Sequence, residues 1–127
     1  MRLFVVRHAE AAPGEPDELR PLTATGRATA RALAQRLTAE GVELVLSSPL
    51  LRARETAGEI ARAAKAPVEI DERLAPGATP DAFRAAVAGR GETIVAVGHQ
   101  PDCGDLVLAL TGRLERFEPA TFVEVEL

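Results

Sequence analysis

Residues 3–10 read Leu3-Phe4-Val5-Val6-Arg7-His8-Ala9-Glu10, an apolar run that ends in an arginine and a histidine. Apolar and β-branched residues without polar alternation are typical of a strand that is covered on both faces of a parallel sheet. Such a strand brings its polar end to the carboxyl edge of the sheet, where open α/β sheets bind ligands. Arg7 and His8 therefore either line a site for a phosphate or carboxylate, or only solvate the end of the strand.

Length and composition limit the class of protein. The chain has 127 residues, enough for one hydrophobic core, so we expect a single domain over residues 1–127. Its formal net charge of -4 argues against nucleic acid or an anionic membrane as the main partner. It has no apolar run long enough to cross a bilayer and no cleavable signal before the first strand, which predicts a cytoplasmic protein. The single cysteine, Cys103, agrees with a reducing compartment.

The rest of the chain alternates predicted strands and helices. Further strands are expected at residues 42–46, 68–70 and 93–97, of which 68–70 is the weakest and 93–97 is central, with helices after Thr23, Ser48, Thr79 and Pro101. Residues 121–126 alternate apolar and charged side chains, the pattern of an edge strand with one face in water. The sequence therefore predicts an α/β three-layer sandwich with a mostly parallel central sheet and an antiparallel edge strand.

Three local features refine this prediction. Residues 11–22 hold three prolines and a glycine, which predicts a long irregular loop over the ligand crevice. Gly26 lies on the buried face of the first helix, where the missing side chain would allow a close approach to a neighbouring segment. Ser48 and Pro49 are expected to be the N-cap and first residue of the second helix. The outer face of the first helix is expected to be solvated, at Arg27, Arg31 and Gln35.

The chain has two histidines, and both follow apolar strands. His8 and His99 are therefore expected at the same edge of the sheet, which Arg7 and Arg52 also reach. Two imidazoles and two guanidiniums together form a pocket for a dianion such as a phosphoryl group. Arg7, Arg52 and His99 would donate hydrogen bonds to the phosphoryl group. A neutral His8, held through its other ring nitrogen by a backbone carbonyl, would attack phosphorus. This chemistry requires no metal ion or other cofactor.

The chain resembles the histidine phosphatase superfamily, also called the phosphoglycerate mutase-like family. The matching segments occur in the expected order: Arg7-His8-Ala9-Glu10, Leu22-Thr23-Ala24-Thr25-Gly26, Ser48-Pro49-Leu50-Leu51-Arg52-Ala53 and Val97-Gly98-His99. The resemblance implies that His8 is the nucleophile and that Arg7, Arg52 and His99 bind the phosphoryl group. Ala9 replaces the commoner glycine, as is tolerated in the short SixA-type phosphohistidine phosphatases.

The general acid has no clear counterpart in the sequence. Many members of the family supply a glutamate from a long lid insertion, but residues 71–92 leave room for only one short helix. Glu72 and Asp102 are the candidates for the acid, although Asp102 could equally stabilise a helix dipole in a first turn.

The missing lid also affects the expected substrate. An open site favours a phosphorylated side chain on a protein over a small metabolite, and the labile P–N bond of phosphohistidine needs little acid assistance. We therefore expect a SixA-type phosphohistidine phosphatase that is a monomer or a weak dimer. A phosphomonoesterase for a sugar phosphate or nucleotide, and a non-catalytic phosphate-binding domain, remain alternatives.

Overall fold

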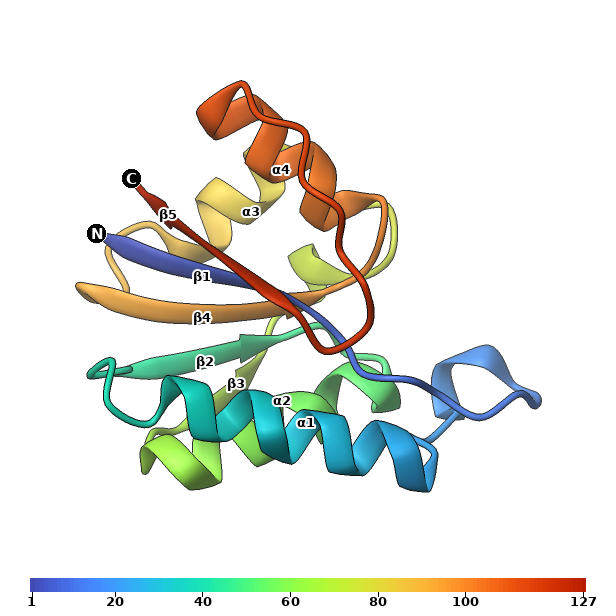
Figure 1. Cartoon of the computed structure of the whole chain (residues 1–127). Helices are drawn as coiled ribbons and strands as arrows, with labels where there is room; N and C mark the ends of the chain where they lie inside the picture. The colour runs from blue at the N-terminus through green and yellow to red at the C-terminus, as the bar shows by residue number, and fades with distance from the viewer.

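The computed structural model describes residues 1–127 and contains one five-stranded sheet with the strand order β3-β2-β4-β1-β5 (Figure 1). Its strands are β1 (Arg2–Arg7), β2 (Leu44–Ser47), β3 (Val68–Ile70), β4 (Thr93–Gly98) and β5 (Phe122–Glu126). β1, β2, β3 and β4 pair in parallel, whereas β5 pairs antiparallel with β1 at one edge. The predicted fold class is confirmed, including the antiparallel edge strand.

Helices cover both faces of the sheet. They are α1 (Ala24–Leu37), α2 (Leu51–Ala64), α3 (Pro80–Val87) and α4 (Asp102–Thr111), with short 3-10 helices η1 (Asp17–Leu19) and η2 (Glu72–Leu74). Helices α1 and α2 lie on one face, and α3 and α4 lie on the other (Figure 1). No helix has both the length and the hydropathy that crossing a membrane requires.

The two central strands supply both layers of the hydrophobic core. Leu3 and Val5 of β1 pack in the cluster beneath α3 and α4, which also contains Cys103. Phe4 and Val6 point to the opposite face and pack in the cluster beneath α1 and α2. The apolar, non-alternating sequence of β1 is therefore explained by burial on both faces.

The pairing of β1 with β4 places the two histidines. Arg7 lies opposite Gly98 in the parallel register, so His8 and His99 are the next residues on neighbouring strands. The His8 backbone N–H donates a hydrogen bond to the Gly98 carbonyl over 3.1 Å. The two imidazoles consequently leave the sheet at the same edge, as predicted.

The start of α2 differs from the prediction. The helix begins at Leu51, and its N-cap Leu50 has no side-chain cap, so the expected cap at Ser48 and first helical position at Pro49 were wrong. Ser48 Oγ instead accepts a hydrogen bond from the Leu50 backbone N–H in the turn before the helix. The same oxygen is hydrogen-bonded to His99 and is therefore oriented toward the edge of the sheet rather than toward the helix end.

Helix α1 begins directly against the segment that follows His8. Thr23 caps the helix by accepting a hydrogen bond from Gly26 N–H over 2.9 Å, as its sequence position predicted. A Cβ atom at Gly26 would lie only 2.1 Å from the Glu10 carbonyl oxygen. The close approach expected at Gly26 is therefore confirmed, and it fixes α1 against the backbone two residues beyond His8.

The substitution Gly26→Ala tests this contact. We expect it to lower the free energy of unfolding by about 1–3 kcal/mol, because the added methyl group has no room beside the backbone of Glu10. Gly58→Ala in α2 is the matched control, since a Cβ there meets nothing within 4 Å. The control should raise stability by about 0.5–1 kcal/mol through helix propensity. Urea unfolding measures both, and equal effects of the two substitutions would contradict the close approach.

Candidate active site

His8 is half-buried at the carboxyl end of β1, and its ring is held by the backbone of the next residue. Its Nδ1 lies 2.7 Å from the Ala9 carbonyl oxygen. A carbonyl can only accept, so Nδ1 carries the proton and Nε2 keeps its lone pair. Burial lowers the pKa of His8 below 6.5, and the nearby charges of Arg52 and Arg7 add to this effect against the hydrogen bond to Ala9. His8 is therefore a neutral imidazole with a nucleophilic Nε2.

His99 faces His8 from the end of β4. The two ring centroids are 5.1 Å apart, and only 4% of the His99 surface is exposed. Its Nε2 is hydrogen-bonded to Ser48 Oγ over 2.7 Å, while no protein group bonds to its Nδ1. Burial, followed by the charges of His8 and Arg52, lowers the pKa of His99 to about 3. His99 is therefore neutral without a ligand and has one ring nitrogen available to an incoming group.

Two arginines at the same edge have donor groups that the protein does not fully use. Arg7 donates one hydrogen bond to the Phe117 carbonyl, but its Nε is buried and has no hydrogen-bond partner. An unpaired buried donor is costly unless a ligand satisfies it. Arg52 is only 7% exposed and projects from the first turn of α2. The positive charges of both guanidiniums contribute to lowering the pKa of His8, so the arginines and the imidazoles form one cluster of groups.

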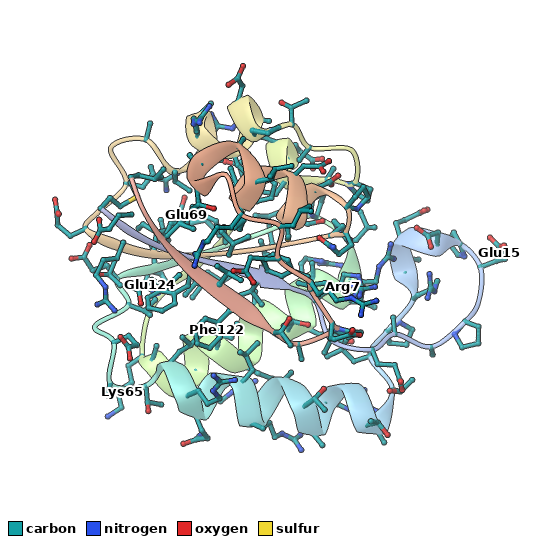
Figure 2. The ribbon with its side chains drawn as sticks, turned by 45° about the horizontal axis from the view of Figure 1, so that its top comes forward. Arg7, Glu15, Lys65, Glu69, Phe122 and Glu124 are labelled. Atoms are coloured by element: carbon teal, nitrogen blue, oxygen red, sulfur yellow. The ribbon has the colours of Figure 1, made fainter.

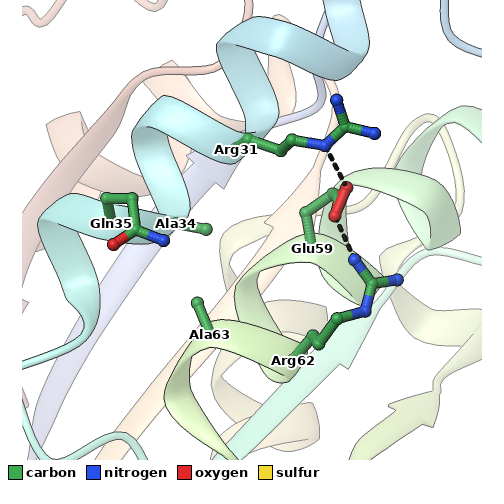
Figure 3. Close-up of a pocket in the computed structure, with 6 residues that line it drawn as sticks. All are labelled: Arg31, Ala34, Gln35, Glu59, Arg62 and Ala63. Carbon is green, nitrogen blue, oxygen red and sulfur yellow. Dashed lines mark hydrogen bonds and ion pairs between the residues drawn. The ribbon is translucent and has the colours of Figure 1, made fainter.

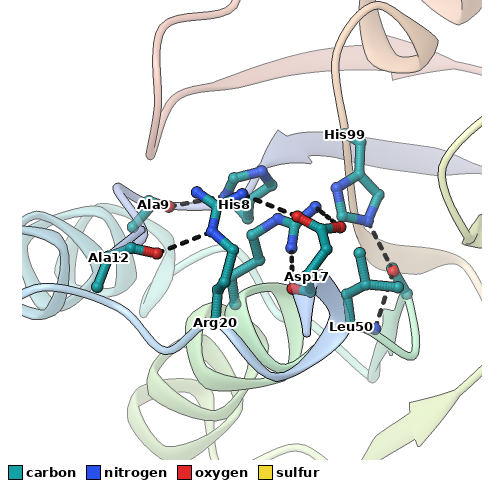
Figure 4. Close-up of polar contacts among 9 residues, drawn as sticks. His8, Ala9, Ala12, Asp17, Arg20, Leu50 and His99 are labelled. Atoms are coloured by element: carbon teal, nitrogen blue, oxygen red, sulfur yellow. Dashed lines mark hydrogen bonds and ion pairs between the residues drawn. The ribbon is translucent and has the colours of Figure 1, made fainter. Parts of the chain in front are cut away.

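A carboxylate that the sequence analysis did not select also lies in this pocket (Figure 4). Asp17 accepts hydrogen bonds from Arg20 over 2.9 Å and from Arg52 over 3.2 Å, and its backbone carbonyl accepts a second bond from Arg52. These two arginines lower the pKa of Asp17, so its carboxylate is ionised. Asp17 is a negatively charged group bound where the arginines would otherwise meet an anion.

Asp17 and Arg20 belong to the proline-rich loop over residues 11–22. Figure 2 shows Glu15 near the tip of this loop, beyond the end of the sheet at which Arg7 lies. The loop was expected to be irregular, but residues 17–19 form η1, which turns Asp17 back toward Arg52. Arg20 Nε donates to the Ala12 carbonyl and so closes the base of the loop. The loop therefore reaches this edge of the sheet through the contacts of Asp17 with Arg52.

Thr56 connects the segment that follows His8 to the first turn of α2. The Ala9 backbone N–H donates to Thr56 Oγ1 over 3.0 Å, and Thr56 Oγ1 donates to the Arg52 carbonyl over 2.9 Å. The backbone that holds His8 Nδ1 is thus tied to the turn of α2 that carries Arg52. All these groups are buried, so the tie is shielded from water.

The two acid candidates from the sequence lie outside this network. Glu72 is exposed in η2, and its carboxylate makes no hydrogen bond or ion pair. Asp102 is buried, and its carboxylate accepts hydrogen bonds from the backbone N–H groups of Gly77 and Ala78. The structure thus brings together His8, His99, Arg7 and Arg52, with Asp17 as the carboxylate in contact with one of them.

The comparisons with known proteins agree with this arrangement. The family described as the histidine phosphatase superfamily (branch 1) matches residues 3–76. An uncharacterized protein of Picosynechococcus sp. is 39% identical over 120 residues, which are 87% of this chain and 73% of that protein. The phosphohistidine phosphatase SixA of Escherichia coli is 32% identical over 121 residues, covering 87% of this chain and 74% of the relative.

A solved structure shows the same similarity in three dimensions. The protein histidine phosphatase SixA complexed with tungstate superposes with a TM-score of 0.89 at 29% identity, and the match covers 100% of this chain and 88% of the other. The family match spans more than half of the sequence and includes His8, Arg7 and Arg52. The chain therefore belongs to the histidine phosphatase superfamily, as its motifs indicated.

Proposed function

We propose that this protein is a metal-independent phosphohistidine phosphatase that acts on phosphorylated proteins through a phosphohistidine intermediate at His8. The observation that carries the proposal is the hydrogen bond from His8 Nδ1 to the Ala9 carbonyl, beside an Arg7 Nε that is buried without a partner. The first contact leaves a nucleophile, and the second leaves a donor for an oxyanion. The related SixA structure holds tungstate, a tetrahedral oxyanion with the shape of phosphate.

The first step transfers the phosphoryl group to His8. Nε2 of His8 attacks phosphorus while the P–N bond to the substrate imidazole breaks, and the leaving nitrogen takes up a proton. Arg7, Arg52 and Nδ1 of His99 stabilise the charge on the equatorial oxygens as donors that are already in place. In the second step water attacks phosphorus, His8 leaves with the electrons of the P–N bond, and inorganic phosphate is released.

Asp17 is the proton donor that the geometry supports best. Its carboxylate is ionised while Arg20 and Arg52 hold it, and 58% of its side chain is exposed, so an incoming phosphoryl group can displace it from Arg52. Once it loses this ion pair and meets the negative phosphoryl group, its pKa rises and it can carry a proton. Asp17 would then protonate the leaving imidazole and later accept the proton of the attacking water.

The segments around the site favour a protein as the substrate. The segment between β3 and β4 contains η2 and α3, and α3 buries Phe83, Ala86 and Val87 in the core instead of covering the histidines. In η1, Leu19 is 55% exposed and lies two residues beyond Asp17. A site without a covering insertion and with an exposed apolar side chain nearby suits a side chain that another protein presents.

Hydrolysis of a P–N substrate by the His8→Gln variant tests the proposal. Release of phosphate from a histidine-phosphorylated protein should fall by several orders of magnitude, because the covalent route loses its nucleophile. Far-UV circular dichroism should match that of the wild-type protein. Retained turnover would refute the mechanism. Faster hydrolysis by the wild-type protein of sugar phosphates or nucleotides than of phosphohistidine would favour a small-molecule phosphomonoesterase.

The substitution Asp17→Asn separates binding from proton transfer. Inorganic phosphate should inhibit this variant more strongly, because the neutral amide competes less for Arg52, while kcat should fall about 10²-fold or more. Asp81→Asn is the matched control, since Asp81 is an exposed helix residue paired only with Arg84. An unchanged kcat in the Asp17 variant would exclude it as the proton donor, and unchanged phosphate inhibition would show that its ion pair does not compete with the ligand.

A further inference from the structure

The outer surface of α1 and α2 carries a groove lined by arginines. It consists of two adjoining hollows with volumes of about 400 and 230 Å³. We name it the arginine groove, and the residues that line it include Arg27, Arg31 and Gln35 on α1 and Arg54, Glu55, Gly58, Glu59 and Arg62 on α2. Figure 3 shows one end, where Arg31 and Arg62 approach Glu59 from the two helices. The outer face of α1, expected to be only solvated, is therefore one wall of a groove.

The residues that line the groove form two rows with the same spacing. Arg27, Arg31 and Gln35 follow one another at intervals of four along α1, and Arg54, Gly58 and Arg62 do so along α2. Residues four apart lie on the same side of a helix. Gly58 leaves the middle of the second row open, because a Cβ at this position would meet nothing within 4 Å.

Only some of the arginines in the groove form ion pairs that stabilise the fold. Glu59 pairs with both Arg31 and Arg62, so these three side chains hold α1 to α2. Glu55 accepts a hydrogen bond from the Leu22 backbone N–H and is also committed to the fold.

Arg27 and Arg54 have no carboxylate partner. Arg27 donates only to the Leu22 carbonyl, and the Arg54 guanidinium makes no hydrogen bond or ion pair. The charges of these two guanidiniums are not neutralised by a carboxylate, although the net charge of the whole chain is -4. They provide a local attraction for an acidic partner that the protein as a whole does not.

One end of the groove lies beside the loop that carries Asp17. Arg27 and Glu55, which line this end, are both hydrogen-bonded to Leu22, the last residue of that loop. From Arg27 to Gln35 the groove runs along eight residues of α1, or about 12 Å at 1.5 Å per residue. A partner that lies in the groove would therefore reach the loop that carries Asp17 at its near end.

We propose that the arginine groove docks an acidic helix of the phosphoprotein substrate, a step that rests on the proposed function. A length of about 12 Å corresponds to two turns of a helix. Carboxylates four apart on that helix have the spacing of Arg27 and Arg31, and carboxylates eight apart have the spacing of Arg54 and Arg62. A free polyphosphate fits less well, because its charges lie closer together than side chains four apart on a helix. Docking there would select protein substrates without contributing to the chemistry at His8.

Binding of an unphosphorylated peptide tests the docking step directly. The probe is a labelled helical peptide of four turns with glutamates at intervals of four on one face, followed by fluorescence anisotropy at low salt. The wild-type protein should bind it, and added salt should weaken binding. The double variant Arg54→Glu/Gly58→Glu should bind at least about 10-fold more weakly, because it places two negative charges in the groove. Arg54→Gln should show a smaller loss.

Two controls separate this effect from a general change in charge or helicity. Gly58→Ala keeps the charge of the groove, and Arg84→Glu reverses a charge on α3, across the sheet from the groove. Both should bind the peptide like the wild-type protein. Equal binding by the wild-type protein and the double variant, or binding of tripolyphosphate with no binding of the peptide, would overturn the proposal.

A kinetic measurement then links docking to turnover. The same acidic helix with a phosphohistidine beyond one end should show a KM raised about 10-fold in the double variant at unchanged kcat. Hydrolysis of phosphoramidate, a small P–N compound, should be unaffected. An equal loss on both substrates would contradict docking. Because the peptide of the binding assay carries no phosphate, a failure of phosphohistidine hydrolysis would refute the proposed function while leaving the docking result separate.

Discussion

The hydrogen bond from His8 Nδ1 to the Ala9 carbonyl determines what the active site can do. It fixes the proton on Nδ1 and leaves Nε2 unprotonated, with its lone pair free. The surrounding backbone holds this geometry, because His8 N–H is bonded to Gly98 and Ala9 N–H to Thr56. Thr56 in turn bonds to the turn that carries Arg52. Hydrogen bonds therefore connect the sheet, the segment that carries His8 and the turn of α2 that carries Arg52 into one unit.

The second constraint is electrostatic. Arg7 and Arg52 are gathered around two imidazoles whose pKa values they help to lower, so the site is positively charged although both histidines are neutral. Without a ligand, the Asp17 carboxylate neutralises part of this positive charge by pairing with Arg20 and Arg52. An incoming phosphoryl group would take over the Arg52 contact and change the protonation of Asp17. Binding and proton supply would thereby be coupled through one ion pair.

The fold and the four central site residues could be predicted from the sequence for physical reasons. The uninterrupted apolar runs of β1 and β4 required burial on both faces, and parallel pairing then placed His8 and His99 at the same edge. Gly26 was identified because a helix face without a side chain indicates a close backbone approach.

The remaining features depend on tertiary contacts that no local pattern reports. Ser48 was assigned to the end of α2 from its cap-like position, but its hydroxyl bonds to His99, a residue 51 positions away. Asp17 is one of several charged residues in a proline-rich loop, and only the fold brings it to Arg52. The outer face of α1 was predicted to be only solvated, because the other wall of the arginine groove comes from α2, which the sequence of α1 does not report.

The most direct test of this mechanism is to identify the atom that carries the phosphoryl group in the intermediate. The protein would be labelled with nitrogen-15 histidine, mixed with a phosphodonor and quenched in base, in which phosphohistidine survives. The NMR shifts of the two His8 ring nitrogens would then be recorded. We predict phosphorus on Nε2 of His8, with Nδ1 unmodified. Phosphorus on Nδ1, on His99, or on no histidine at all would contradict the role assigned to the bond between His8 and Ala9.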